Sequence, residues 1–196
     1  MRDPALASIY VSYFNETHRM VRDTMRRFVN EAVKPHIDAW EEAGGFPREV
    51  YVQAGNLGLL GIGHPTEFGG AGEADVFLKV AASEELMRSG SGGFVASLGS
   101  LDIGLPPIWR TGSRALKQRI VPQVLAGEKI IALAITEPSG GSDVANLKTR
   151  AVRDGDHYVV NGSKTFITSG ARADYYTVAV RTGEAGFGGV SLLLIE

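Results

Sequence analysis

The spacing of the apolar residues changes near Gly127, and this change constrains the fold more than any other feature of the chain. Between Asn15 and Glu42 the apolar side chains recur every three or four residues, as on one face of a helix. After Gly127 they form short runs of the kind found in strands. Helices followed by strands predict an α+β chain, with a helical domain over residues 1–127 and a β domain over residues 128–196.

Several helices are predicted before Gly127. Asn15 is a suitable N-cap for the first, and Pro35 is expected to bend or interrupt it. A second helix begins near Pro47, and a third covers residues 77–87. The run "GGFVASLGSLDIGLPPIW" predicts one buried helix. Ser113 caps the last helix, which Pro122 is expected to divide.

Six strands are predicted after Gly127, and the dipeptide Asp154-Gly155 between two of them indicates a tight hairpin. The last run reaches Glu196, so the predicted sheet ends on a strand with an exposed edge. We therefore expect the β domain to be incomplete and the chain to be the first part of a longer protein. The six runs are "IIALAIT", "KTRAVRD", "HYVVNG", "KTFITSG", "DYYTVAVRT" and "VSLLLIE".

Composition excludes several classes of function. The formal net charge is −2 and the pI is near 6.1, which does not indicate nucleic-acid binding, and the basic run "RDTMRR" is interpreted as a solvated helix face. The chain has no cysteine, and its four histidines lack the spacing of metal ligands, so no metal site is predicted. Neither a signal peptide nor a transmembrane segment is visible. We expect a soluble, intracellular protein.

The stretch "TEPSGGSD", residues 136–143, follows the apolar run "IIALAI" directly. Gly140 and Gly141 can turn backbone N–H groups toward an anion, as in a phosphate-binding nest. Glu137 and Asp143 would repel a phosphate, so we expect them to point away from it and hold the backbone of the loop. A Gly/Ser turn without any ligand is the alternative interpretation.

A second segment, "NGSKTFITSGARAD", follows about 25 residues downstream. If "TFIT" is extended, Phe166 and Thr168 project from the same face of a strand. An aromatic wall with a hydroxyl beside it suits a flat heterocycle. Alternatively, Phe166 belongs to the core and Thr168 reflects β-propensity alone.

These two segments in this order closely resemble the acyl-CoA dehydrogenase family of flavoproteins. The runs "GLLGI", "EFGGAG" and "KQRIVPQVLAGEKI" also resemble landmarks of that family, and the resemblance covers residues 16–196. It implies an N-terminal helical domain, a β-barrel-like middle domain and a C-terminal helical domain that this chain lacks. It also implies a homotetramer or homodimer, in the cytoplasm or, in a eukaryote, the mitochondrial matrix.

The resemblance implies that the chain binds FAD, with the Thr168 hydroxyl near flavin N5 and Ser142 also near the CoA part of the substrate. Ser139 replaces a glycine that is common in the family, and Phe166 replaces a common tryptophan. Neither departure is expected to prevent flavin binding. The implied FAD-binding residues are Leu133, Ala134, Ile135, Thr136, Gly141, Ser142, Phe166, Ile167 and Thr168.

The implied reaction is the α,β-dehydrogenation of an acyl-CoA thioester to the trans-2-enoyl-CoA in fatty acid β-oxidation. FAD accepts the hydride, and an electron-transferring flavoprotein takes the electrons. The base is a glutamate expected in the absent C-terminal part, so no catalytic residue is assigned here, and these 196 residues alone are expected to be inactive. The helical half is most similar to long-chain members. An acyl-CoA oxidase, a flavin monooxygenase or a non-catalytic nucleotide-binding fragment are the alternatives.

Overall fold

The computed structural model describes residues 13–72 and 75–196 of the chain. Contacts divide the chain into two compact units. The helical unit consists of residues 1–98 and 122–128, and the sheet unit of residues 99–121 and 129–196. The domain boundary between residues 127 and 128 stays a prediction.

In the helical unit, the N-cap of helix α2 is Asn15, as predicted. The Asn15 side chain accepts the His18 N–H at 3.1 Å, and His18 Nδ1 accepts the Asn15 N–H at 3.0 Å. A π-helical turn and Pro35 then interrupt the helix, as expected. The α-helices wholly within this unit are α2 (Glu16–Phe28), α3 (Ile37–Glu42), α4 (Glu49–Asn56), α5 (Val76–Met87) and α6 (Gly92–Leu98).

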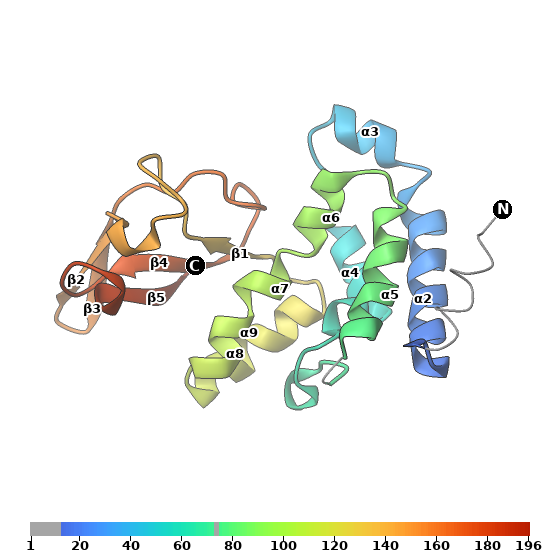
Figure 1. Cartoon of the computed structure of the whole chain (residues 1–196), viewed down its shortest axis with the longest axis horizontal. Coiled ribbons are helices and arrows are strands. Elements are labelled where there is room, and N and C mark those ends of the chain that lie inside the picture. The colour runs from blue at the N-terminus through green and yellow to red at the C-terminus, as the bar shows by residue number, and fades with distance from the viewer. Residues whose placement is uncertain (1–12, 73–74) are drawn as a thin grey trace. The chain divides into compact units, whose positions relative to one another are not determined.

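Helices α2 and α5 lie side by side (Figure 1), and a buried carboxylate connects them. Glu85 is 2% exposed and accepts hydrogen bonds from Arg26 at 2.7 and 3.1 Å. Arg22 donates to Glu84 at 2.7 Å. The run "RDTMRR" is therefore only partly a solvated face, because two of its arginines pair with α5. No helix in the described residues is both long and apolar enough to cross a membrane.

Two predictions about the later helices are wrong. The run from Gly92 to Trp109 forms three short helices, since Gly99 and Pro106 fall where the helical hydrogen bonds stop. Pro122 does not divide the last helix, which continues through it; Ala126 N–H donates to Pro122 O at 2.9 Å. The three short helices are α6, α7 (Leu101–Gly104) and α8 (Pro106–Thr111), and the helix that contains Pro122 is α9 (Arg114–Leu125).

The sheet unit holds one mixed, five-stranded sheet. In it β4 pairs in parallel with β1 and antiparallel with β5, so that the three strands lie side by side (Figure 1). Strands β2 and β3 form the predicted hairpin at Asp154-Gly155, where Gly155 has a φ of +57°. The strands are β1 (Ile131–Ala134), β2 (Arg150–Asp154), β3 (His157–Asn161), β4 (Tyr175–Arg181) and β5 (Val190–Ile195).

Helix α7 is fixed to this sheet by two buried hydroxyls. Ser100 Oγ donates to Ile131 O at 2.9 Å, and Thr177 Oγ1 donates to Gly104 O at 2.7 Å. Gly104 permits this approach, because a Cβ there would lie 3.2 Å from the Ile131 side chain. Helix α7 therefore covers the beginning of strand β1, at Ile131 and Ala132.

The predicted strand "KTFITSG" does not form. Residues 162–174 run as a loop with turns between β3 and β4, and Phe166 has a left-handed φ of +56°. Strand geometry cannot continue through such a residue. Phe166 and Thr168 therefore do not share a strand face, and that expectation is corrected.

Candidate functional site

The first predicted segment leaves the sheet at the end of β1. Leu133 and Ala134 are its last residues, and Ile135 and Thr136 follow it, half-buried. A tight turn comes next, in which the backbones of Glu137 and Gly140 exchange two hydrogen bonds of 3.0 Å. The predicted Gly/Ser turn is thus present.

Glu137 is buried under this turn, with 5% of the residue exposed. Its carboxylate accepts the N–H of Lys148 at 2.6 Å, the N–H of Thr149 at 2.8 Å and the Lys164 ammonium at 2.9 Å. Burial by itself raises the pKa of Glu137, but polar contacts from Thr149, Lys148 and Lys164 outweigh it and lower the pKa from 4.5 to about 2. The carboxylate points into the protein and anchors the backbone of residues 148–149, so the expectation that it would hold the backbone of its own loop is corrected.

Asp143 is exposed and has a smaller role. Its carboxylate accepts the Asn146 side-chain amide at 2.6 Å, and its carbonyl accepts the Asn146 N–H at 3.1 Å. These bonds close a short 3-10 turn, η4 (Val144–Asn146). The carboxylate of Asp143 therefore meets a side chain of its own loop, while the backbone bond of the turn is made by the Asp143 carbonyl, so the predicted carboxylate-to-backbone bond is not formed.

The second predicted segment lies against the first. Lys164 Nζ donates to Ile135 O at 2.8 Å, and the Thr165 N–H donates to Thr136 O at 3.0 Å. Two consecutive residues of one segment are therefore bonded to two consecutive residues of the other. The structure brings together the two stretches that the sequence analysis joined on resemblance alone.

Phe166 follows this contact with its side chain in solvent. The residue is 91% exposed, and its backbone is left-handed, which is unfavourable for a side chain of this size. Ile167 has the opposite environment, because it packs against the core around Ala134 and Val178. Thr168 is half-buried. Phe166 is thus not a core residue, which removes that alternative.

The two residues after Gly140 in this turn have small side chains and are exposed to solvent. Gly141 and Ser142 are exposed, and a Cβ on Gly141 would lie 3.1 Å from Thr136 Cγ2 and 3.3 Å from Thr136 Oγ1. A side chain there would press on Thr136. Ser139 tolerates its position, since only Phe166 and Ser169 among the described non-glycine residues have a positive φ.

These features fit a flat aromatic group with a charged tail. Phe166 offers an exposed ring, and Gly141 offers exposed backbone. Thr136, whose carbonyl accepts the N–H of the residue before Phe166, is half-buried and carries a hydroxyl. Such a surface can cover one face of a heterocycle and accommodate a phosphate close to the main chain. Within the described residues, no group of three or more His, Asp or Glu side chains gathers to hold a metal ion.

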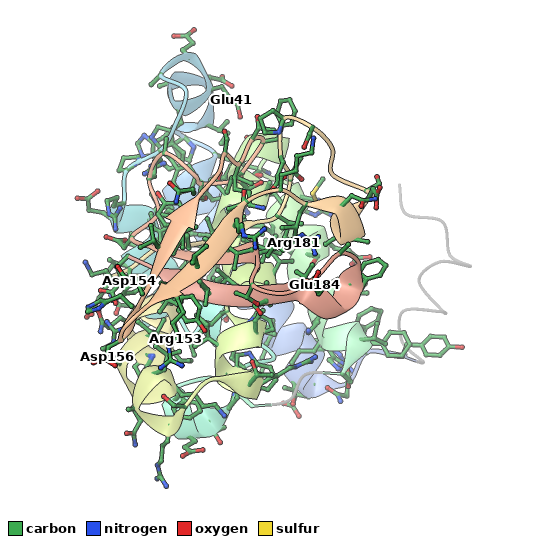
Figure 2. All side chains as sticks on the ribbon, turned by 90° about the vertical axis from the view of Figure 1, so that its left-hand side faces the viewer. Glu41, Arg153, Asp154, Asp156, Arg181 and Glu184 are labelled. Carbon is green, nitrogen blue, oxygen red and sulfur yellow. The ribbon has the colours of Figure 1, made fainter. Side chains whose placement is uncertain are left out.

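A polar depression of about 480 Å³ lies beyond the loop, with Lys148, Arg150 and Glu184 in its lining. Arg181, which also lines it, lies near Glu184 (Figure 2) and donates to Glu184 O at 2.6 Å and Ala145 O at 2.6 Å. Arg181 also donates to Leu147 O at 3.1 Å. The guanidinium thus connects the η4 turn to the loop between β4 and β5.

The sequence analysis did not single out Lys164. It is the one charged residue in the run from Asn161 to Gly170, and a lone charge in a neutral run beside a proposed site is a signal that could have found it. Its partner Ile135 O lies 29 residues away in sequence, so periodicity could not reveal the contact.

Comparison with protein families decides the identity of the chain. Residues 15–128 match the acyl-CoA dehydrogenase N-terminal domain, and residues 132–196 match the acyl-CoA dehydrogenase middle domain. The chain belongs to the acyl-CoA dehydrogenase family. The predicted order of a helical and a β domain is therefore confirmed, as is the assignment to a family of flavoprotein oxidoreductases.

The relatives of this chain differ in the substrate that their names give. The mitochondrial long-chain specific acyl-CoA dehydrogenase of Mus musculus is 39% identical over 93% of this chain and 43% of its own length. The cyclohexane-1-carbonyl-CoA dehydrogenase of Geobacter metallireducens is 35% identical over 93% of this chain and 48% of its own. The chain spans about half the length of the curated relatives it matches.

Solved structures agree with this family. A putative acyl-CoA dehydrogenase from Mycobacterium smegmatis is 49% identical with a TM-score of 0.90, over 94% of this chain and 48% of its own. An acyl-CoA dehydrogenase from Bacillus anthracis, solved in complex with FAD, is 33% identical with a TM-score of 0.84, over 94% of this chain and 32% of its own. That complex is a property of the Bacillus protein.

Proposed function

We propose that the protein containing this chain oxidises an acyl-CoA thioester to the trans-2-enoyl-CoA, using FAD held partly by the candidate site. The observation that carries this proposal is Phe166, a residue that is 91% exposed on a left-handed backbone beside the loop after β1. An uncovered aromatic on an unfavourable backbone is expected where a ligand covers it. Family membership supplies the class of ligand.

The proposed contacts are those that the resemblance to the family implies, and the surface described above is compatible with them. Phe166, Ile167 and Thr168 would border the flavin ring, with the Thr168 hydroxyl near N5. Residues 133–136 would line the ring from the other segment, and the backbone of Gly141 and Ser142 would meet its polar edge or a phosphate oxygen. Ser142 would also meet the CoA part of the substrate. These contacts remain proposals.

When bound, FAD supplies the hydride acceptor of the reaction. The chain's own residues would orient the ring and exclude water from one face. The base that removes the α-proton is proposed to be a glutamate outside residues 1–196, and an electron-transferring flavoprotein is the proposed electron acceptor. We also propose assembly as a homotetramer or homodimer. Acyl chain length stays a prediction that favours long chains, since the relatives' named substrates differ.

The proposal is tested with the protein expressed from its complete coding sequence. We expect a yellow protein whose flavin band bleaches when a matching acyl-CoA is added without oxygen, and a panel from short branched to long straight chains would show which one matches. Rapid return of the band in air would indicate an acyl-CoA oxidase or a monooxygenase. A colourless protein would overturn the proposal in favour of a non-catalytic role.

Gly141→Val is expected to lower FAD content in that protein. The new side chain begins 3.1 Å from the Thr136 side chain, so it pushes Thr136 and covers backbone proposed to meet the cofactor. Gly188→Ala is the matched control, because a Cβ there has nothing within 4 Å. The ratio of flavin to protein absorbance after purification measures the effect. Equal flavin content in both variants would remove the loop from the site.

A further inference from the structure

Most of the Lys164 side chain is shielded from solvent although it carries a charge. Its side chain is 11% exposed and pairs at 2.9 Å with the Glu137 carboxylate, whose side chain is 3% exposed. Replacing such a pair by apolar residues of similar volume is often neutral or stabilising, so stability alone is weak grounds for keeping it. The presence of this ion pair in the protein interior therefore needs a reason other than the stability of the fold.

The second contact of Lys164 suggests that explanation. Its ammonium also donates to Ile135 O at 2.8 Å, while the next residue, Thr165, donates its N–H to Thr136 O at 3.0 Å. Three consecutive residues, 135–137, are therefore bonded to two consecutive residues, 164–165. This clamp replaces the strand pairing that the left-handed Phe166 prevents.

A lysine can join these groups where an apolar side chain cannot. Its ammonium is a donor in several directions and meets both a backbone carbonyl and a carboxylate. An apolar residue would leave Ile135 O without this partner and Glu137 with an unbalanced charge. The lysine thus determines how closely the loop after β1 approaches the segment that carries Phe166.

We propose that Lys164 is a positioning residue of the candidate site: its ammonium holds the backbone of residues 135–137 against the segment that carries Phe166 and Thr168. The inference rests on the proposed function, because the geometry so held is that of the proposed flavin contacts. Lys164 acts through Ile135 and Glu137 and is not itself assigned a contact with the cofactor.

The test uses the full-length protein and compares Lys164→Met with Lys129→Met. Lys129 is also in the sheet unit and pairs with Asp174 at 3.3 Å, but its side chain is 42% exposed. Lys164→Met is expected to weaken FAD binding by roughly tenfold to a hundredfold, the range seen for residues that support metal ligands. It is also expected to change the visible circular dichroism of bound flavin. Lys129→Met should change neither.

A double variant separates positioning from folding. Lys164→Met leaves the Glu137 charge buried, so the protein could fail to fold; Glu137→Gln/Lys164→Met removes both charges and is expected to recover the melting temperature of the apoprotein. Its FAD binding should stay weak, because Ile135 O has still lost its partner. Recovery of both properties, or wild-type FAD binding in Lys164→Met, would overturn the inference. A wild-type protein that binds no FAD would instead overturn the proposed function.

Discussion

Gly127→Ala is expected to lower the free energy of unfolding by more than about 3 kcal/mol, because alanine would meet the backbone of α4. Gly127 ends α9 with a φ of +74°, and a Cβ there would lie 2.1 Å from Tyr51 O and 2.3 Å from Tyr51 C. Its N–H donates to Val124 O at 3.0 Å. The next residue, Glu128, donates to Gln123 O at 3.0 Å, which completes a Schellman motif. Both the left-handed backbone and the close approach require glycine.

Gly44→Ala is the matched control for this prediction. Gly44 ends α3 in the same motif, with a φ of +69°, and its N–H donates to Glu41 O at 3.2 Å while the Gly45 N–H donates to Trp40 O at 2.9 Å. A Cβ on Gly44 has nothing within 4 Å, so only the cost of the left-handed backbone remains, about 1 kcal/mol. Urea unfolding followed by far-ultraviolet circular dichroism measures both variants. Equal losses would contradict the packing of Gly127 on α4.

Glu137→Gln is expected to remove much of the loss of stability on acidification between pH 4.5 and pH 2. The folded-state pKa of Glu137 lies near 2 and the ordinary value is 4.5, so the carboxylate is stabilised by folding. Its contribution is complete above about pH 4.5 and is lost as the pH falls through about 2. The difference between the two pKa values corresponds to roughly 3 kcal/mol.

At neutral pH the same substitution is expected to destabilise the protein by about 3–5 kcal/mol, because the Lys164 ammonium loses its buried counter-charge. The difference in unfolding free energy between wild type and variant should therefore shrink as the pH falls. Asp143→Asn is the control, since Asp143 is an exposed carboxylate on the same loop. Urea unfolding at a series of pH values provides the measurement. A difference that stays constant with pH would show that the Glu137 charge does not stabilise the fold.

Local signals in the sequence predicted the elements that depend on neighbouring residues. The Asn15 cap, the interruption at Pro35 and the Asp154-Gly155 hairpin all form as expected. Five of the six predicted strands form. The two proline and glycine errors, at Pro122 and in the run from Gly92 to Trp109, arose because helix breakers act with different strength in different surroundings.

Fewer of the predictions about the candidate site were correct than of those about helices and strands. Charge predicted that Glu137 and Asp143 would bond to protein groups, but it did not identify their partners, which are the backbone of residues 148–149 for Glu137 and the Asn146 side chain for Asp143. The conformation at Phe166 could not be foreseen, since "TFIT" has the composition of a strand and the left-handed backbone depends on its surroundings. The assignment of these residues to a flavin remains a prediction from resemblance.

The order of helices and strands, the change between them near Gly127 and the family of the chain could all be read from the residue pattern. These features depend on residues close together in the chain or on whole motifs. The contacts of Lys164 with Ile135 and Glu137, and the close approach of Gly127 to Tyr51, could be found only in the folded structure. Such contacts join residues 27 or more positions apart, and their geometry exists only after the backbone between them has taken its path.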